Sequence, residues 1–117
     1  YGVYIAAKRH FQNLTQMNER EKNNLAQILK ETAGMLDSLF DYTFPYMMCM
    51  YQNPVNGEDV SDCYHFHIAF YPPMRSADKI KFNASSETGA WAHCNPTAPE
   101  EKAKELREAH KRFLEKQ

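Results

Sequence analysis

An alternating stretch at residues 63–71 restricts the fold of this chain more than any other feature. Its two sets of alternate positions are Tyr64, Phe66, Ile68 and Phe70, and His65, His67, Ala69 and Tyr71. Because successive side chains of a strand point to opposite faces, the pattern predicts a strand with one buried face and both histidines on the other. The consecutive prolines at 72 and 73 end this strand, since proline cannot continue a ladder of hydrogen bonds.

Three further strands and two loops complete the predicted β structure. We expect strands at residues 2–7, 42–51 and 79–84. Pro45 inside the second of these has no N–H to donate, so this strand is predicted to lie at an edge or to contain a bulge. Residues 52–62 and 85–96 are rich in polar and turn-forming residues and are predicted to be loops.

Two amphipathic helices are predicted, at residues 19–40 and from Pro99 to residue 115. Asn18 with Glu21 before the first, and Thr97 with Glu100 before the second, fit capping boxes. The predicted buried positions of the second helix are Ala103, Leu106, His110, Phe113 and Leu114. The element order predicts an α+β fold, with an antiparallel sheet flanked by helices, in a single domain over residues 1–117.

Composition excludes several classes of protein. The 117 residues include 14 Lys and Arg against 15 Asp and Glu, and this net charge of -1 argues against a nucleic-acid binder. No apolar run approaches the roughly 20 residues that span a bilayer. The odd number of cysteines, Cys49, Cys63 and Cys94, does not suggest a disulfide framework, so a reducing, cytoplasmic compartment is expected. The first residue is not Met and falls inside a predicted strand, which suggests a fragment of a longer protein.

The histidine pair is the main candidate for chemistry. On a strand, His65 and His67 would share a face with their Cα atoms about 6.5–7 Å apart. Such a pair can hold a metal, attack a phosphorus centre, or bind a phosphate-bearing ligand. It can equally be a pair of half-buried structural histidines with backbone partners. Ala69 leaves space beside His67, which favours a cleft on this face.

Several motifs point to a known family. The frame from His65 to Ala69 resembles the H-φ-H-φ-H pattern of the histidine-triad superfamily, with Ala69 in place of the third histidine. The run FPYMM at residues 44–48 resembles the FPYSM of galactose-1-phosphate uridylyltransferases, and HIAFYPPMRSA at 67–77 resembles their HAHYYPPLLRSA. Lys81-Phe82 and Ser86-Glu87 resemble their KF…E run. The resemblance covers nearly the whole chain.

The resemblance implies a role as the second of two histidine-triad-like halves. The family's first half carries an H-P-H segment whose second histidine becomes uridylylated, and this chain has no H-P-H. The implied enzyme exchanges UMP between UDP-glucose and galactose 1-phosphate as a cytoplasmic homodimer, without nucleic-acid or membrane partners. This half would then need the N-terminal half as a partner, hold no catalytic residue, and be inactive alone; zinc could be bound in the N-terminal half.

The resemblance also implies which residues contact the substrate. Lys81, Phe82 and Glu87 match the sugar-phosphate contacts of the family, and His65 and His67 are further candidates. Lysine offers a point charge for phosphate, and a carboxylate accepts hydrogen bonds from sugar hydroxyls. The alternative is that Lys81 and Glu87 are ordinary surface charges. Trp91 is interpreted as a core residue and not as a platform for a sugar ring.

A metal site is not expected in this half. Of the three histidines that hold the metal in the second half of the family, only His67 is present; Tyr51 and Ala69 occupy the other positions. Tyr and Ala cannot rebuild a zinc or iron site. A site rebuilt from Cys63, His65 and His67 is the alternative. His10, at the end of the first strand, is interpreted as structural.

Two other functions are compatible with the pattern. The chain could be a stand-alone histidine-triad nucleotide hydrolase or transferase with His67 as its nucleophile, although the residue that contacts the scissile phosphate in that superfamily is replaced. It could also be a non-catalytic interaction module that kept the fold. Binding of a nucleotide sugar would separate this third hypothesis from the others.

Overall fold

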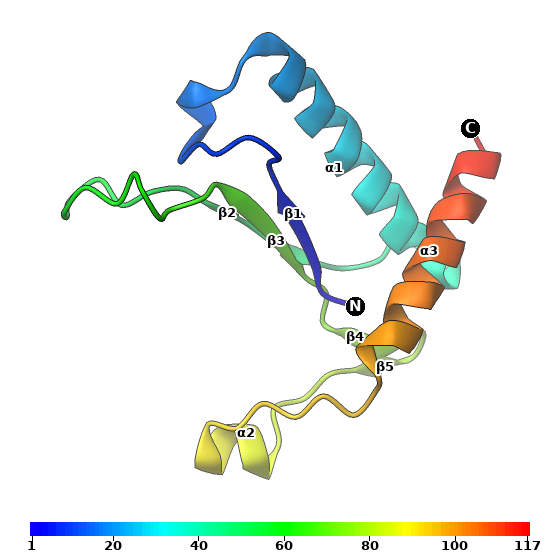
Figure 1. The fold of residues 1–117 in the computed structure, drawn as a ribbon. Helices are drawn as coiled ribbons and strands as arrows, with labels where there is room; N and C mark the ends of the chain where they lie inside the picture. The colour runs from blue at the N-terminus through cyan, green and yellow to red at the C-terminus, as the bar shows by residue number, and fades with distance from the viewer. The chain divides into compact units, whose positions relative to one another are not determined.

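The computed structural model describes all 117 residues, which form two compact units. The sheet unit comprises Gly2–Lys30 and Tyr46–Pro72, and the helical unit comprises Tyr1, Glu31–Pro45 and Pro73–Gln117. The elements in chain order are β1 (Val3–Ala6), the 3-10 helix η1 (Leu14–Gln16), α1 (Glu19–Phe40), β2 (Met47–Tyr51), β3 (His67–Tyr71), β4 (Met74–Ser76), β5 (Lys79–Ile80), α2 (Ser85–Ala90) and α3 (Pro99–Glu115) (Figure 1). The fold is α+β as predicted, and the single domain stays a prediction.

The sheet unit is built around β3, which pairs antiparallel with β1 on one side and β2 on the other (Figure 1). Ile68 lies opposite both Ile5 and Met50, and Phe70 lies opposite Val3 and Met48. Ile68 and Phe70 are fully buried. The apolar face predicted from the alternating stretch is therefore the buried face of the central strand.

The strand predicted at residues 63–71 is shorter than expected and begins only at His67. The reason is that the preceding backbone bonds to other segments. The N–H of Tyr64 donates to the carbonyl of Val60 (2.8 Å), and the N–H of Phe66 donates to that of Phe11 (2.8 Å). The prediction that His65 and His67 share one strand was therefore wrong.

The strand predicted at residues 42–51 also begins later, at Met47, two residues after Pro45. The prediction that it lies at an edge was correct, since β2 pairs only with β3. The side chains of β2 are largely exposed, and Met47 is 65% exposed.

Helix α1 begins and ends where the sequence predicted it. The capping box is formed: Asn18 Oδ1 accepts from the N–H of Glu21, and Glu21 Oε2 accepts from the N–H of Asn18, both at 2.9 Å. Arg9 adds two hydrogen bonds of 2.8 Å to the same carboxylate. The guanidinium of Arg9 and the Asn18 N–H lower the pKa of Glu21 to about 2.

In the helical unit, α3 packs against the second part of α1. The ring of Phe113 occupies the space above Gly34, where no side chain could be accommodated. His110 Nε2 lies 3.1 Å from Glu31 Oε2, and Arg112 donates to the carbonyl of Ser38 (2.8 Å). No helix of this structure is both long enough and apolar enough to cross a membrane.

Two details of α3 differ from the prediction. Ala98 is its N-cap and offers no side-chain hydrogen bond, so the capping box predicted at Thr97 does not form. Leu114 is 49% exposed, whereas Ala109 is fully buried. Of the other positions predicted to be buried, all are half-buried: Ala103, Leu106, His110 and Phe113.

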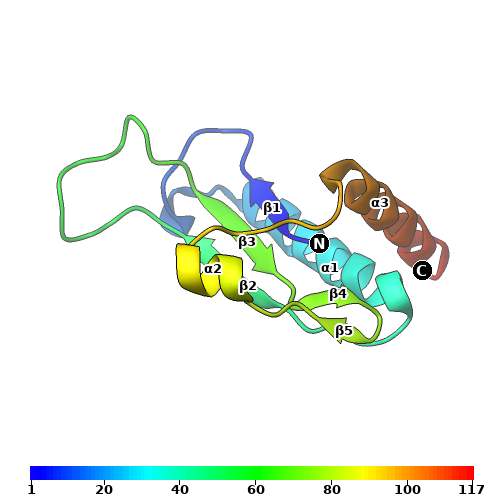
Figure 2. The same cartoon turned by 90° about the horizontal axis from the view of Figure 1, so that it is seen from below.

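The segment between β3 and α3 departs most from the prediction. The strand expected at 79–84 ends at Ile80, where β5 pairs with the unpredicted β4 (Figure 2). The loop expected at 85–96 contains α2. Trp91, interpreted as a core residue, is 88% exposed and adopts a left-handed conformation (φ 53°) at the end of α2. It ends the helix in the way that glycine usually does.

Candidate functional site

The five predicted substrate-binding residues fall into two groups. His65 and His67 belong to the sheet unit, and Lys81, Phe82 and Glu87 belong to the helical unit.

His67 is held at two points and keeps one ring nitrogen open. Its Nδ1 lies 3.0 Å from the carbonyl oxygen of His65. Since a carbonyl oxygen only accepts, Nδ1 carries the hydrogen, and Nε2 of the neutral ring is an acceptor. The ring of Tyr51 stacks on the imidazole, with centroids 4.7 Å apart and planes 11° apart. His67 therefore presents Nε2 in a fixed orientation.

His65 has no open ring nitrogen. Its Nε2 lies 2.8 Å from the carbonyl oxygen of Ala7, and its Nδ1 lies 3.1 Å from Nδ1 of His10. Nε2 of His10 in turn lies 2.8 Å from the carbonyl oxygen of Ser61. These contacts join the segment after β1 to the loop before β3. They agree with the structural role expected of His10 and extend it to His65.

Tyrosines lie beside His67 on the same face of the sheet. Tyr51 lies opposite His67 across β2 and β3, and its hydroxyl is 2.8 Å from that of Tyr71. The hydrogen bond to Tyr51 raises the pKa of Tyr71, and a hydrogen bond from Tyr4 acts in the opposite direction. Fully buried Ala69 lies between Tyr4 on β1 and Cys49 on β2. From the sequence, Tyr51 was predicted only to be a lost ligand; that its ring stacks on His67 depends on the register between β2 and β3.

No three His, Cys, Asp or Glu side chains are grouped to hold an ion. Cys63 is exposed and directs its Sγ toward the carbonyl of Val60 (3.6 Å), not toward the histidines. At the positions where the family has histidine ligands, Tyr51 uses its ring to stack on His67 and Ala69 has no donor atom. The residues do not fit the metal of the family's second half, and its absence stays a prediction.

Lys81 and Phe82 follow β5 and are open to solvent. The backbone N–H of Lys81 donates to the carbonyl of Pro73 (2.6 Å), which fixes the start of the segment. The side chain of Lys81 makes no hydrogen bond or ion pair within the chain, and Phe82 is 73% exposed. A free ammonium beside an exposed aromatic ring can receive a phosphorylated sugar.

Glu87 is the buried acid of α2 and is only 8% exposed. Its Oε2 accepts from the N–H of Ala84 and from the hydroxyl of Ser86, both at 3.0 Å, and its Oε1 accepts from the N–H of Cys94 (3.2 Å). These donors, the Ala84 N–H first, lower the pKa of Glu87 to about 2. The ionised carboxylate holds residues 84–94 together, and one lone pair of Oε1 is left to accept from a ligand.

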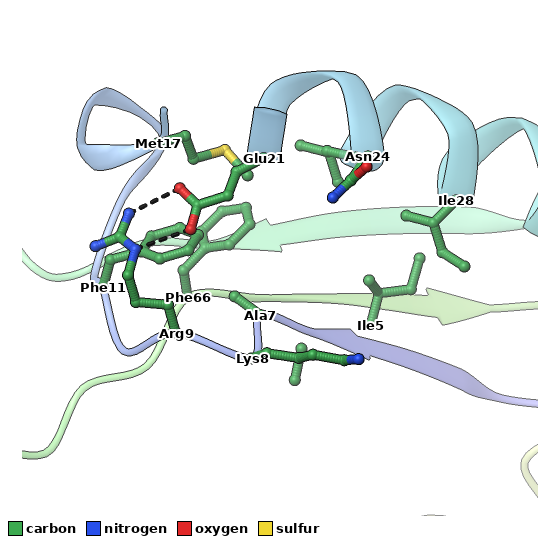
Figure 3. A pocket seen from close by; sticks show the side chains of 12 residues that line it. Ile5, Ala7, Lys8, Arg9, Phe11, Met17, Glu21, Asn24, Ile28 and Phe66 are labelled. Carbon is green, nitrogen blue, oxygen red and sulfur yellow. Dashed lines mark hydrogen bonds and ion pairs between the residues drawn. The ribbon is translucent and has the colours of Figure 1, made fainter. Parts of the chain in front are cut away.

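The sheet unit also contains a cavity of about 370 Å³, between the first part of α1 and the sheet (Figure 3). Its walls are mostly apolar and include Ile5, Phe11, Leu25, Ile28 and Phe66. Figure 3 shows Arg9 and Glu21 bonded to each other at one end. None of the five predicted site residues lines this cavity, and its one acid is neutralised by Arg9.

Comparisons with known proteins identify relatives over almost the whole chain. The family described as galactose-1-phosphate uridyl transferase, C-terminal domain, matches residues 1–114. The galactose-1-phosphate uridylyltransferase of Thermotoga maritima is 50% identical over 108 residues, which are 92% of this chain and 34% of the relative. That of Saccharomyces cerevisiae is 38% identical over 85 residues, which are 70% of this chain and 23% of the relative.

A solved structure of a uridylyltransferase is similar in three dimensions, with a TM-score of 0.82 and 32% sequence identity. The match covers 95% of this chain and 35% of that chain. The chain thus spans about a third of the length of the solved relative. With the family match over residues 1–114, these findings show that the chain belongs to the galactose-1-phosphate uridyl transferase C-terminal domain family.

Proposed function

We propose that this chain is the hexose-phosphate-binding half of an enzyme that exchanges UMP between UDP-glucose and galactose 1-phosphate. The match to the C-terminal domain of this transferase family over residues 1–114 carries the proposal. The match covers 92% of this chain but only 34% of the relative, which supports a chain that works with a further part.

In this proposal, the catalytic histidine lies in an N-terminal half that carries the H-P-H segment. The reaction has two steps: the histidine of that half takes UMP from UDP-glucose and releases glucose 1-phosphate, and galactose 1-phosphate then takes the UMP to give UDP-galactose. This chain supplies no catalytic residue. Its task is to hold the hexose phosphate in line with the uridylyl-histidine, so it is inactive by itself.

The open residues of the chain are assigned to substrate. Lys81 provides a positive charge for the phosphate, and the exposed ring of Phe82 packs against the apolar face of the hexose. Glu87 accepts from a sugar hydroxyl with the one lone pair of Oε1 that its bonds within the chain leave unused. His67 offers Nε2 as a further polar contact. His65, proposed from the sequence as a direct contact, is assigned a supporting role, because both its ring nitrogens are bonded within the chain.

We further propose that the assembled enzyme is a cytoplasmic homodimer, as the family resemblance implies. The three unpaired cysteines support a reducing compartment.

The proposal is tested by assaying the chain together with the N-terminal half. With UDP-glucose and galactose 1-phosphate, we expect UDP-galactose and glucose 1-phosphate to form in equal amounts. Neither half should form these products alone. Hydrolysis of UDP-glucose without transfer to the sugar phosphate would contradict the proposed reaction.

One observation supports a second function. His67 donates from Nδ1 to a backbone carbonyl and leaves Nε2 free, as a nucleophilic histidine must. A histidine-triad hydrolase or transferase that uses His67 would be active without any other half, so the same assay on the chain alone separates the two functions.

A further inference from the structure

The geometry points to a single proton shared by His10 and His65. Four ring nitrogens are involved, and each has a close partner. Nε2 of His10 lies 2.8 Å from the carbonyl oxygen of Ser61, and Nε2 of His65 lies 2.8 Å from that of Ala7. The two Nδ1 atoms lie 3.1 Å from each other.

The hydrogen count follows from the partners. Because carbonyl oxygens only accept, both Nε2 atoms must carry hydrogens. If neither Nδ1 carried one, two lone pairs would face each other at 3.1 Å; if both did, two hydrogens would collide. A single hydrogen between them gives one N–H···N bond and satisfies all four nitrogens. The pair then carries one positive charge that is shared by both rings.

The charged side chains around this pair are mixed in sign. Lys8 and Arg9 precede His10, and Arg9 is neutralised by Glu21. On the loop side, Asp59 accepts from the N–H of Ser61 (2.9 Å), the residue whose carbonyl receives His10, and Asp62 follows in the chain. The loop that bonds His10 therefore carries acidic residues, and the segment that precedes His10 carries basic ones.

The pair acts on His67 through the backbone. The carbonyl oxygen of His65 accepts from Nδ1 of His67 (3.0 Å), while the ring of His65 is fixed to Ala7 and His10. His10 and His65 are thus positioning residues: they hold the carbonyl that fixes the tautomer of His67 and leaves its Nε2 free. The effect on substrate rests on the proposed function of His67, whereas the shared proton and the tautomer do not.

The test is nuclear magnetic resonance of the ring nitrogens in the 117-residue chain labelled with ¹⁵N-histidine, at neutral pH. We expect one strongly downfield proton coupled to the Nδ1 atoms of His10 and His65, and His67 with its hydrogen on Nδ1. His10→Ala should remove the downfield proton and leave His67 in a mixture of tautomers.

Two further variants test whether the downfield proton and the tautomer of His67 depend on a histidine at position 10. In His10→Gln, the amide can donate to a neutral His65 Nδ1, so the downfield proton should be lost while the His67 tautomer is kept. His93→Ala removes an exposed histidine without hydrogen bonds and should change neither signal. A parent spectrum without a shared proton, or uptake of one equivalent of added zinc by the two Nδ1 atoms, would overturn the inference. So would a His67 tautomer that is unchanged in His10→Ala.

Binding of galactose 1-phosphate to the assembled enzyme is measured separately. We expect His10→Ala to raise KM several-fold with kcat little changed. If the tautomer of His67 changes but KM does not, the proposed role of the His10–His65 pair is supported, and the assignment of His67 to substrate binding is wrong.

Discussion

The contact between α1 and α3 and the segment at residues 81–94 belong to the same unit but are built in opposite ways. At the helix contact, Gly34 has no room for a side chain, and polar groups such as His110 and Glu31 pair with each other. In the segment, Lys81, Phe82 and Trp91 are exposed, and Gly89 has no neighbour within 4 Å of a Cβ position. The closed region determines stability, whereas the open region has side chains left for a ligand.

Gly34→Ala is expected to have the largest effect. A Cβ at Gly34 would lie 2.1–2.6 Å from three ring atoms of Phe113, so the ring must move. Overpacking of this kind costs about 1–3 kcal/mol, which outweighs the gain of up to about 1 kcal/mol in helix propensity. If the ring of Phe113 cannot relax, the overpacking cost less the propensity gain lowers the free energy of unfolding by about 2 kcal/mol. Urea denaturation measures this change.

Gly89→Ala is the matched control for this prediction. It removes a glycine from a helix where the new methyl group meets nothing, so it should stabilise α2 slightly, by up to about 1 kcal/mol. Equal effects of the two substitutions would show that the regions do not differ in packing.

Lys81→Ala tests the open region. Loss of a charged hydrogen bond to phosphate costs about 1.5–3 kcal/mol, so affinity for galactose 1-phosphate in the assembled enzyme should fall at least about tenfold. Stability should not change, because the side chain has no partner within the chain. Calorimetric titration measures the affinity. Lys79→Ala, an exposed lysine of β5 in the same segment, is the control, and an equal loss of affinity there would refute the assignment of Lys81.

Glu87 makes the open segment sensitive to acid. Its pKa is lowered from 4.5 to about 2 in the folded chain, so its stabilising contribution is present above pH 4.5 and is lost as the pH falls toward 2. In Glu87→Gln, the amide cannot accept from all three donors, and this acid-dependent loss should disappear. Circular dichroism at pH 2–5 measures it, with Glu100→Gln on exposed α3 as the control. A parent-like acid transition in Glu87→Gln would contradict this account.

Trp91→Ala should have the smallest effect. The side chain is 88% exposed, so its removal should change the free energy of unfolding by no more than about 0.5 kcal/mol. A larger loss of stability in a urea titration would show that Trp91 packs, as the sequence analysis assumed. Trp91→Gly would in addition relieve the strain of the left-handed backbone at this position.

The sequence predicted the helices better than the segment between them. Helix α1 was placed correctly because an apolar stripe and the Asn18–Glu21 capping box agree, and both signals are local. Helix α2 was missed because it is six residues long, and Glu87 fixes it through a bond to the N–H of Cys94, seven residues away. No short-range pattern contains such a contact.

For the candidate site, the sequence identified the residue types but not their bonding. The alternation at 63–71 predicted His65 to lie on a strand. In the structure, the N–H of Phe66 bonds to the carbonyl of Phe11, so residues before His67 do not pair in the sheet. The pairing of His10 with His65 joins residues 55 positions apart, which spacing alone does not reveal. The family resemblance supplied Lys81 and Glu87, and the structure shows that their surroundings differ.

The most direct test of the central claim uses UDP-glucose labelled on its α-phosphate. The chain is incubated with it alone, and covalent label on the protein is measured beside a His67→Asn variant. The account predicts no label on either, with label and transfer appearing only when the N-terminal half is added. Label on the chain that disappears in His67→Asn would show that His67 is the nucleophile, and would contradict the role proposed for this half.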